Sequence, residues 1–199
     1  MYLYGASGHA KVIIDILHSV GEKIDGLFDD NDQVTSLNGI DVNHNWQGEE
    51  PIIISIGNNK IRKKVAEKLC CNFTKAIHSS AILSESVRIN DGTVVMAGGI
   101  INADSVVGKH CIINTGASID HECEIGDYSH ISPHATLCGN VKVGEGSWIG
   151  AGSVVIPGIE IGKWCTIGAG AVVIRDIPDN TVVAGIPAKV IKKNNNYGE

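Results

Sequence analysis

The sequence lacks three features that would place it in common functional classes. Its longest apolar runs, residues 51–56 and 12–14, are far too short to span a bilayer, and residues 1–4 resemble a strand and not the start of a signal peptide. The net charge is -6 and the basic residues are scattered, which disfavours nucleic acid as a partner. None of the six cysteines forms a C-x-x-C pair, so neither a zinc site nor a redox pair is indicated. We therefore expect a cytoplasmic protein with no membrane or nucleic-acid partner.

An unbroken six-residue repeat of aliphatic residues fills the second half of the chain. Helices place apolar residues at spacings of three and four and strands at two, so a period of six fits neither. It is typical of a β-solenoid. The repeated positions are Ile77, Leu83, Ile89, Val95, Ile101, Val107, Ile113, Ile119, Ile125, Ile131, Leu137, Val143, Ile149, Val155, Ile161, Ile167 and Val173.

The fourth residue after each of these positions is usually small. Large and small residues that both point inward let three short strands close into a triangular coil filled by side chains. One coil takes eighteen residues, so residues eighteen apart should stack at the strand spacing of about 4.8 Å. Cys111, Cys123 and Cys165 occupy small inward positions and are predicted to fill the core. We predict that the solenoid covers residues 74–175, followed by a closing segment and tail, 176–199.

Residues 1–73 lack this period and predict an α/β unit. Strands are expected at 1–4, 23–28 and 51–56, and helices at 10–20 and 60–69. The order strand, glycine turn, helix, strand, acid is that of half a Rossmann-like nucleotide-binding fold. Glycine lets phosphates approach the turn, and acids at the end of the next strand typically meet ribose or base. The candidate ligand positions are Ser7, Gly8, His9, Asp29, Asp30 and Gly57.

The solenoid carries one candidate catalytic pair, His121 and Glu122. His121 lies at an outward turn position between two acids, and an imidazole paired with a carboxylate is suited to removing a proton from an amine or hydroxyl. His130 follows half a coil later, so in one chain it should lie on a different side. A site that uses both histidines therefore requires two subunits. His134 lies at another turn and is interpreted as structural or peripheral.

Four segments together resemble one family. They are Tyr4-Gly5-Ala6-Ser7-Gly8-His9-Ala10-Lys11, Ile56-Gly57-Asn58-Asn59, the His121-Glu122 pair, and Ala184-Gly185-Ile186-Pro187-Ala188-Lys189. The chain resembles the hexapeptide-repeat sugar O- and N-acyltransferases of the sialic acid O-acetyltransferase type, and most closely the bacillosamine-pathway enzymes that act on a UDP-linked 4-amino sugar. The resemblance implies a left-handed parallel β-helix behind a Rossmann-like half domain, and a homotrimer with active sites between subunits.

The same resemblance implies residue roles. His121 would act as the base on the C4 amine, Glu122 would raise its basicity, and Asn114 would lie near the amine. The UDP-sugar would bind at Ser7, Gly8, His9, Asp29, Asp30 and Gly57. Acetyl-CoA would lie between subunits, with its thioester carbonyl near His130, its pantetheine along Ala151 and Ala169, and its phosphates near Lys189 and Lys192. No metal is expected.

Several alternatives stay open at this point. O-acetylation of a sugar such as sialic acid, or N-acetylation of a GDP-linked amino sugar, would use the same fold and base. A zinc-dependent hydratase on the same solenoid and a non-catalytic nucleotide-sugar sensor are the alternatives from other classes.

Overall fold

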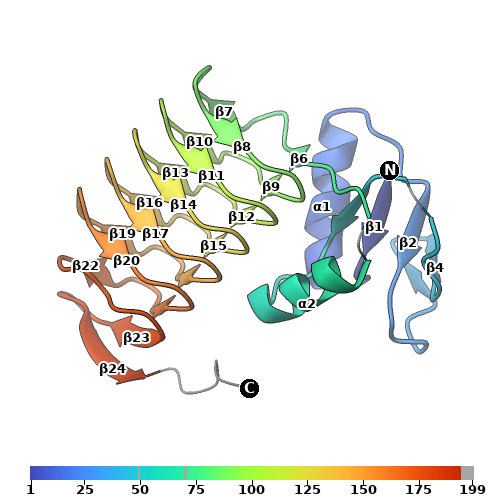
Figure 1. Ribbon diagram of the computed structural model, residues 1–199. Helices are drawn as coiled ribbons and strands as arrows, with labels where there is room; N and C mark the ends of the chain where they lie inside the picture. Colours follow the sequence, from blue (N-terminus) through green and yellow to red (C-terminus); the bar gives the residue numbers. More distant parts are fainter. Residues whose placement is uncertain (49, 70, 194–199) are drawn as a thin grey trace.

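The computed structural model describes residues 1–48, 50–69 and 71–193 and consists of an α/β unit followed by a parallel β-helix (Figure 1). The α/β unit contains one sheet in the order β3-β4-β2-β1-β5, in which only the β3–β4 pair is antiparallel. Its elements are β1 (Tyr2–Tyr4), α1 (Gly8–Ser19), β2 (Gly26–Phe28), β3 (Ser36–Leu37), β4 (Ile40–Asn43), β5 (Ile52–Ile54) and α2 (Asn59–Leu69).

The β3–β4 hairpin is absent from the sequence prediction. Its turn is Asn38-Gly39, and both residues adopt positive φ, 50° and 77°. Asn-Gly is the favoured pair for a two-residue hairpin turn of this kind, so the signal was present in the sequence. Helix α1 begins at Gly8, two residues before the predicted start, because Ser7 already has the extended backbone of an N-cap residue.

The β-helix confirms the predicted eighteen-residue coil. Ile100 pairs with Ser118, which pairs with Thr136, and the other strands keep the same register. The two-residue strands are β6 (Ala76–Ile77), β7 (Ile82–Leu83), β8 (Arg88–Ile89), β9 (Val94–Val95), β10 (Ile100–Ile101), β11 (Val106–Val107), β12 (Ile112–Ile113), β13 (Ser118–Ile119), β14 (Glu124–Ile125), β15 (His130–Ile131), β16 (Thr136–Leu137), β17 (Lys142–Val143), β18 (Trp148–Ile149), β19 (Val154–Val155), β20 (Glu160–Ile161), β21 (Thr166–Ile167) and β22 (Val172–Val173).

Three sheets form the sides of the β-helix. We name them by their first and last strands: the β7–β22 sheet, the β8–β20 sheet and the β6–β24 sheet. The last of these ends in β23 (Thr181–Ala184), which pairs in parallel with β21, and β24 (Lys189–Lys193), which runs antiparallel to β23. Residues 194–199 of the predicted closing segment and tail lie outside the described residues.

Close backbone approach at the turns explains their glycines. A Cβ added at Gly144 would lie 2.6 Å from backbone atoms of Gly162 and Lys163 in the next coil, and one at Gly126 would lie 2.6 Å from the Glu145 nitrogen. No real side chain tolerates such contacts, so the coils stack at this spacing only with glycine there. The interior is packed as predicted, because the inward anchors from Ile101 onward and the three predicted core cysteines are buried.

The α/β unit lies beside the first coils of the β-helix (Figure 1). Helix α1 contacts β6, and Val94 and Ile112 of the β6–β24 sheet, with Met96 directly after β9, share one apolar core with Leu3 and other residues of the α/β unit. The two units therefore bury a common hydrophobic surface, which fixes the turns of the α/β unit against one side of the β-helix.

Candidate functional site

His121 and Glu122 form a pair at the corner between β13 and β14. The backbone of Glu122 has φ 58°, and its Oε2 lies 3.0 Å from His121 Nδ1. The His121 side chain is 56 % exposed. When Nδ1–H donates to the carboxylate, Nε2 is left as the basic nitrogen and the pair stabilises the imidazolium that forms on proton uptake. The arrangement suits a general base.

Neighbouring residues hold this imidazole in place. Asp120 Oδ2 lies 4.0 Å from His121 Nε2, and hydrogen bonds from the Asn102 side chain and from the His121 backbone hold the pKa of Asp120 below its usual value. The ring covers Gly139 of the next coil, where an added Cβ would lie 2.6 Å from Nε2. Gly139 is therefore a site residue that the sequence prediction missed, because its role depends on the stacking of coils.

A second group of site residues gathers where the α/β unit meets the β6–β24 sheet. His130 is only 8 % exposed, and its Nε2 lies 3.0 Å from Asn114 Nδ2. Asn114 Oδ1 accepts the Thr115 N–H at 2.8 Å, so Nδ2 is the atom that faces His130 and it donates to Nε2. With Nε2 toward Asn114, the other ring nitrogen, Nδ1, is left for the Gly57 backbone, a hydrogen-bond partner that raises the His130 pKa against the effect of burial. In the contact between Asn114 and His130 Nε2, the hydrogen is therefore carried by Asn114 and not by His130.

His130 is held neutral in this position. Burial, the Arg62 guanidinium and His9 together lower its pKa to about 3. Trp148, one coil further on, stacks on the imidazole with centroids 5.7 Å apart, and its Nε1–H donates to Ser132 Oγ at 2.7 Å. Trp148 is half exposed, and the eighteen-residue spacing from His130 was the sequence signal that could have identified it.

The predicted nucleotide turns come together at the carboxyl ends of β1, β2 and β5. The His9 ring lies against Gly57, about 3.8 Å from where a Cβ would be, and burial lowers the His9 pKa to about 4. Its Nε2 is buried with no hydrogen-bond partner among the described residues. Ser7 is exposed and makes no side-chain capping bond to α1, while Gly8 starts that helix.

Both predicted acids already have protein partners. Asp29 accepts the Ala6 N–H at 2.7 Å and so ties the end of β2 to the β1–α1 turn. Asp30 accepts hydrogen bonds from Tyr4 Oη at 2.5 Å and from Lys68 Nζ at 2.9 Å, which lower its pKa. A carboxylate has about four acceptor positions, so these contacts leave room for a ligand.

Asn114 and two of the predicted acetyl-CoA positions follow one edge of the β-helix. Asn114, Ala151 and Ala169 lie in the turns that connect the β6–β24 sheet to the β7–β22 sheet. Ala151 and Ala169 are exposed in successive coils, with Gly170 N–H donating to the Ala151 carbonyl at 2.8 Å. Lys189 and Lys192 are exposed on β24; Lys189 lies opposite Ala184, at the end of β23 nearest this edge, and Lys192 lies opposite Val182, nearer the start of β23. We call these turns the Asn114 edge.

His121 and His130 lie on different sides of one chain. His121 follows the β7–β22 sheet at its other border, whereas His130 lies on the β6–β24 sheet beside the α/β unit. The two borders of the β7–β22 sheet thus carry the two halves of the predicted site, His121 on one and the Asn114 edge on the other.

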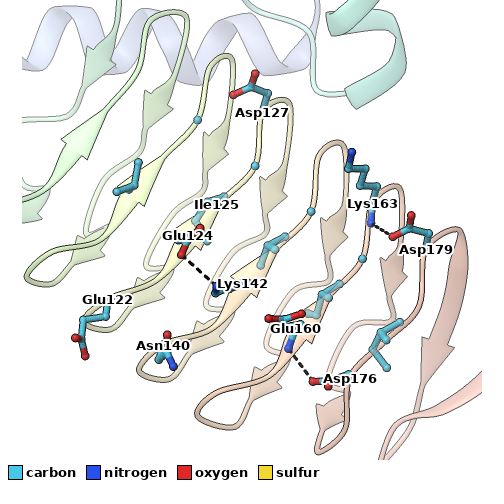
Figure 2. A pocket seen from close by; sticks show the side chains of 18 of the residues that line it. Glu122, Glu124, Ile125, Asp127, Asn140, Lys142, Glu160, Lys163, Asp176 and Asp179 are labelled. Carbon is cyan, nitrogen blue, oxygen red and sulfur yellow. Dashed lines mark hydrogen bonds and ion pairs between the residues drawn. The ribbon is translucent and has the colours of Figure 1, made fainter.

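An open groove of about 1280 Å³ runs along the outer face of the β8–β20 sheet, and Glu122 lies on one of its borders (Figure 2). Charged residues make up nearly half of its lining, and Lys142 pairs with Glu124 across adjacent coils at 3.4 Å. A smaller cavity of about 380 Å³ lies between the end of α2 and the turns of His110 and Tyr128. Apart from Glu122, neither contains a predicted site residue.

Metal and membrane features were also sought in the described part of the chain. Within residues 1–48, 50–69 and 71–193 no group of three or more His, Cys, Asp or Glu side chains is arranged to hold a metal ion. Over the same residues, neither helix has the length and apolar character that crossing a bilayer demands.

Two family models match the two units separately. Residues 1–69 match the PglD N-terminal domain, and residues 104–139 and 140–175 match the bacterial transferase hexapeptide (six repeats). The UDP-N-acetylbacillosamine N-acetyltransferase of Bacillus subtilis is 41% identical over 113 residues, which cover 48% of this chain and 50% of that protein. The chain spans half or less of the length of the curated relatives it matches.

Solved structures match nearly the whole chain. PerB from Caulobacter crescentus, solved with CoA and GDP-perosamine, is 40% identical with a TM-score of 0.91, over 96% of both chains. The acetyltransferase domain of PglB from Neisseria gonorrhoeae is 37% identical with a TM-score of 0.88, over 96% of this chain and 98% of that one. With its two units in the same order and the same overall structure, the chain belongs to the hexapeptide-repeat sugar acyltransferases with a PglD-type N-terminal domain.

Proposed function

We propose that this protein transfers the acetyl group of acetyl-CoA to the 4-amino group of a UDP-linked amino-dideoxy sugar, giving a product of the UDP-N,N'-diacetylbacillosamine type. The observation that carries the proposal is the exposed His121 imidazole with Nδ1 held by Glu122 at 3.0 Å. Family membership supplies the reaction class, and PerB and PglB have been solved with CoA and with acetyl-CoA.

The proposed reaction is direct transfer. The amine nitrogen attacks the thioester carbonyl while His121 Nε2 removes a proton from it, and the new C–N bond forms a tetrahedral oxyanion. The oxyanion collapses, the C–S bond breaks, and CoA thiolate leaves and takes up a proton. Positioning both substrates together supplies much of the rate, so no acyl-enzyme is needed. Cys123, two residues from His121, is buried and its pKa is raised by that burial, which makes it unsuitable as a nucleophile.

The proposal requires a homotrimer with sites between subunits. Outward residues of the β7–β22 sheet carry no charge, in contrast to the neighbouring β8–β20 sheet with Arg88, Glu124, Lys142 and Glu160. An uncharged face is the better subunit contact. Copies that meet through it would bring His121 of one chain to the Asn114 edge of the next. The uncharged row consists of Ile82, Ile100, Ser118, Thr136, Val154 and Val172.

Acetyl-CoA fits the Asn114 edge. The small side chains of Ala151 and Ala169 leave space for pantetheine along successive coils, and Lys189 and Lys192 lie where its phosphates would end. The thioester would lie near His130, and its carbonyl oxygen would take a hydrogen bond from Asn114 Nδ2, because His130 Nε2 is an acceptor there. The reaction would take place in the cytoplasm.

The nucleotide sugar would bind at the turns of Ser7, Gly8, His9, Asp29, Asp30 and Gly57. A GDP-linked amino sugar is the second candidate, because PerB, similar over 96% of the chain, was solved with GDP-perosamine. O-acetylation of a sugar is the third candidate, since the base would be the same.

A substrate panel tests these candidates. Purified protein is incubated with acetyl-CoA and with UDP- and GDP-linked 4-amino sugars or their 4-hydroxy counterparts, and thiol release and product mass are measured. We expect release with the UDP-amino sugar and no acetylation of the hydroxy counterpart. Release only with the GDP-amino sugar would replace the nucleotide assignment, and acetylation of hydroxyl groups alone would contradict N-transfer.

A further inference from the structure

Arg62 on α2 is a buried cation that has no acidic partner among the residues that the structure describes. It is 1 % exposed, and burial lowers its pKa to about 10, so it stays charged near neutral pH. All of its hydrogen bonds that the structure shows go to neutral oxygens. In the sequence it is visible only as the first residue of the basic run Arg62-Lys63-Lys64.

The guanidinium joins three parts of the molecule. Nη1 donates to the Ile56 and Gly57 carbonyls of the β5–α2 loop at 3.0 and 3.1 Å. Nε donates to the His110 carbonyl at 2.7 Å and Nη2 to the Tyr128 carbonyl at 2.8 Å, in turns of two successive coils. Nη2 also donates to Asn59 Oδ1 at 2.8 Å, within α2. The five N–H donors of the rigid Arg62 guanidinium therefore fix the β5–α2 loop to the β-helix.

An apolar residue could fill this space at lower electrostatic cost. Burying a charge is unfavourable unless its hydrogen bonds are all satisfied, and replacing buried charges by apolar residues is often neutral for stability. What an apolar side chain could not supply is a fixed position for the Gly57 carbonyl. The Gly57 backbone is a hydrogen-bond partner of the His130 ring, and Nε2 of that ring lies 3.0 Å from Asn114 Nδ2.

Resting on the proposed function, we infer that Arg62 is a positioning residue of the transfer site: it holds the Gly57 carbonyl where it accepts the Nδ1–H of His130, and so keeps His130 in one neutral tautomer with Nε2 toward Asn114. A displaced Gly57 would release the ring, and Asn114 would lose its orientation beside the acetyl group. Arg62 itself touches neither substrate.

The positive charge of Arg62 also favours the neutral form of His130. Together with burial and His9 on α1 it opposes protonation of His130, while Asn114 and Trp148, which contact the ring from the β-helix, are uncharged. Loss of the guanidinium therefore removes both the fixed acceptor and a nearby positive charge.

The test compares Arg62→Met, Arg62→Lys and the control Lys63→Met. Lys63 is the next residue on α2 and also docks on the β-helix, through Glu145 and the rings of Tyr128 and Trp164, whereas the Gly57 carbonyl takes its hydrogen bond from Arg62. Nitrogen-15 NMR of the His130 ring between pH 5 and 8 reports tautomer and protonation without any substrate. Steady-state kinetics then separate kcat from KM.

We expect wild type and Lys63→Met to show only the Nδ1–H tautomer, with no titration in this range. Arg62→Met should show mixed tautomers, a His130 titration within the range and a kcat about 10- to 100-fold lower, the scale of a small misplacement at a reacting centre. In Arg62→Lys, which keeps the positive charge but loses the forked guanidinium, His130 should stay unprotonated and show mixed tautomers.

A wild-type His130 that carries its proton on Nε2, or that titrates near pH 6.5, would overturn the inference, even if Arg62→Met does not fold. A folded Arg62→Met variant in which His130 keeps the wild-type tautomer and protonation would also overturn the inference. Because the NMR readout needs no transfer, an inactive wild type with the expected ring signals would contradict the proposed function and leave the role of Arg62 at Gly57 in place.

Discussion

At the scale of single residues, the roles of some side chains in the site could be predicted from the sequence, whereas the roles of others depend on tertiary packing. His121 and Glu122 are adjacent in sequence, so their pairing needs only a turn to present them. Arg62, Gly139 and Trp148 have roles that depend on which coil or helix lies next to them, and a single sequence carries no direct record of those neighbours.

Glu122 provides a prediction at this scale. An exposed ion pair is worth up to about 1 kcal/mol, so Glu122→Gln should lower kcat/KM by about fivefold through weaker stabilisation of the His121 imidazolium. Glu124→Gln is the matched control, because Glu124 pairs with Lys142, whereas the acids paired with His121 are Asp120 and Glu122. Initial rates at saturating acetyl-CoA measure both variants. Equal rates for Glu122→Gln and wild type would show that the carboxylate does not assist the base.

At the scale of elements, the six-residue period predicted the β-helix strand by strand, because each coil repeats the same inward positions. Elements outside the repeat were less well predicted. The strand expected at 23–28 is restricted to Gly26–Phe28, although the Asp25 N–H still donates to the Met1 carbonyl just before the β1–β2 ladder. The hairpin at Asn38-Gly39 was missed although its turn residues are typical of one.

The turn glycines give a prediction for the coils. Gly144→Ala should lower the free energy of unfolding by about 3 kcal/mol, because its Cβ would meet backbone of the next coil that has no room to move. Gly152→Ala is the control: its φ of 63° costs about 1 kcal/mol with a side chain, but its surroundings are open within 4 Å. Urea unfolding distinguishes the two. Equal losses would mean that coil spacing is not what requires Gly144.

At the scale of the whole molecule, three neutral histidines lie at the junction of the α/β unit and the β-helix. Burial, joined by the charge of Arg62, lowers the pKa of His9 and His110 to about 4 and that of His130 to about 3. Sequence reasoning could not identify this junction, because residues far apart in the chain create the burial.

These shifts predict that acid destabilises the folded state. An unfolded histidine has a pKa of about 6.5, so the unfolded chain binds protons first as pH falls. The stabilising contribution is complete above about pH 6.5 and is lost progressively toward pH 4, by up to about 1.4 kcal/mol per pH unit for each histidine. Urea unfolding at pH 7.5 and 5.5 measures the loss.

His110→Phe provides the comparison for this prediction. Phenylalanine keeps the stacking on Tyr128 and the edge contact with Phe73 but takes up no proton, so the variant should lose less stability between the two pH values. An identical loss in wild type and variant would contradict the assignment of His110 to this effect.

The transfer rate of His121→Ala tests the central claim most directly. His121 is exposed, so the variant should fold, assemble and bind CoA as the wild type does, which mass in solution and calorimetry verify. With the amino sugar that the wild type accepts, kcat should fall by ~10²–10⁴, the usual contribution of a general base. A folded, CoA-binding His121→Ala that transfers acetyl groups at the wild-type rate would contradict the account.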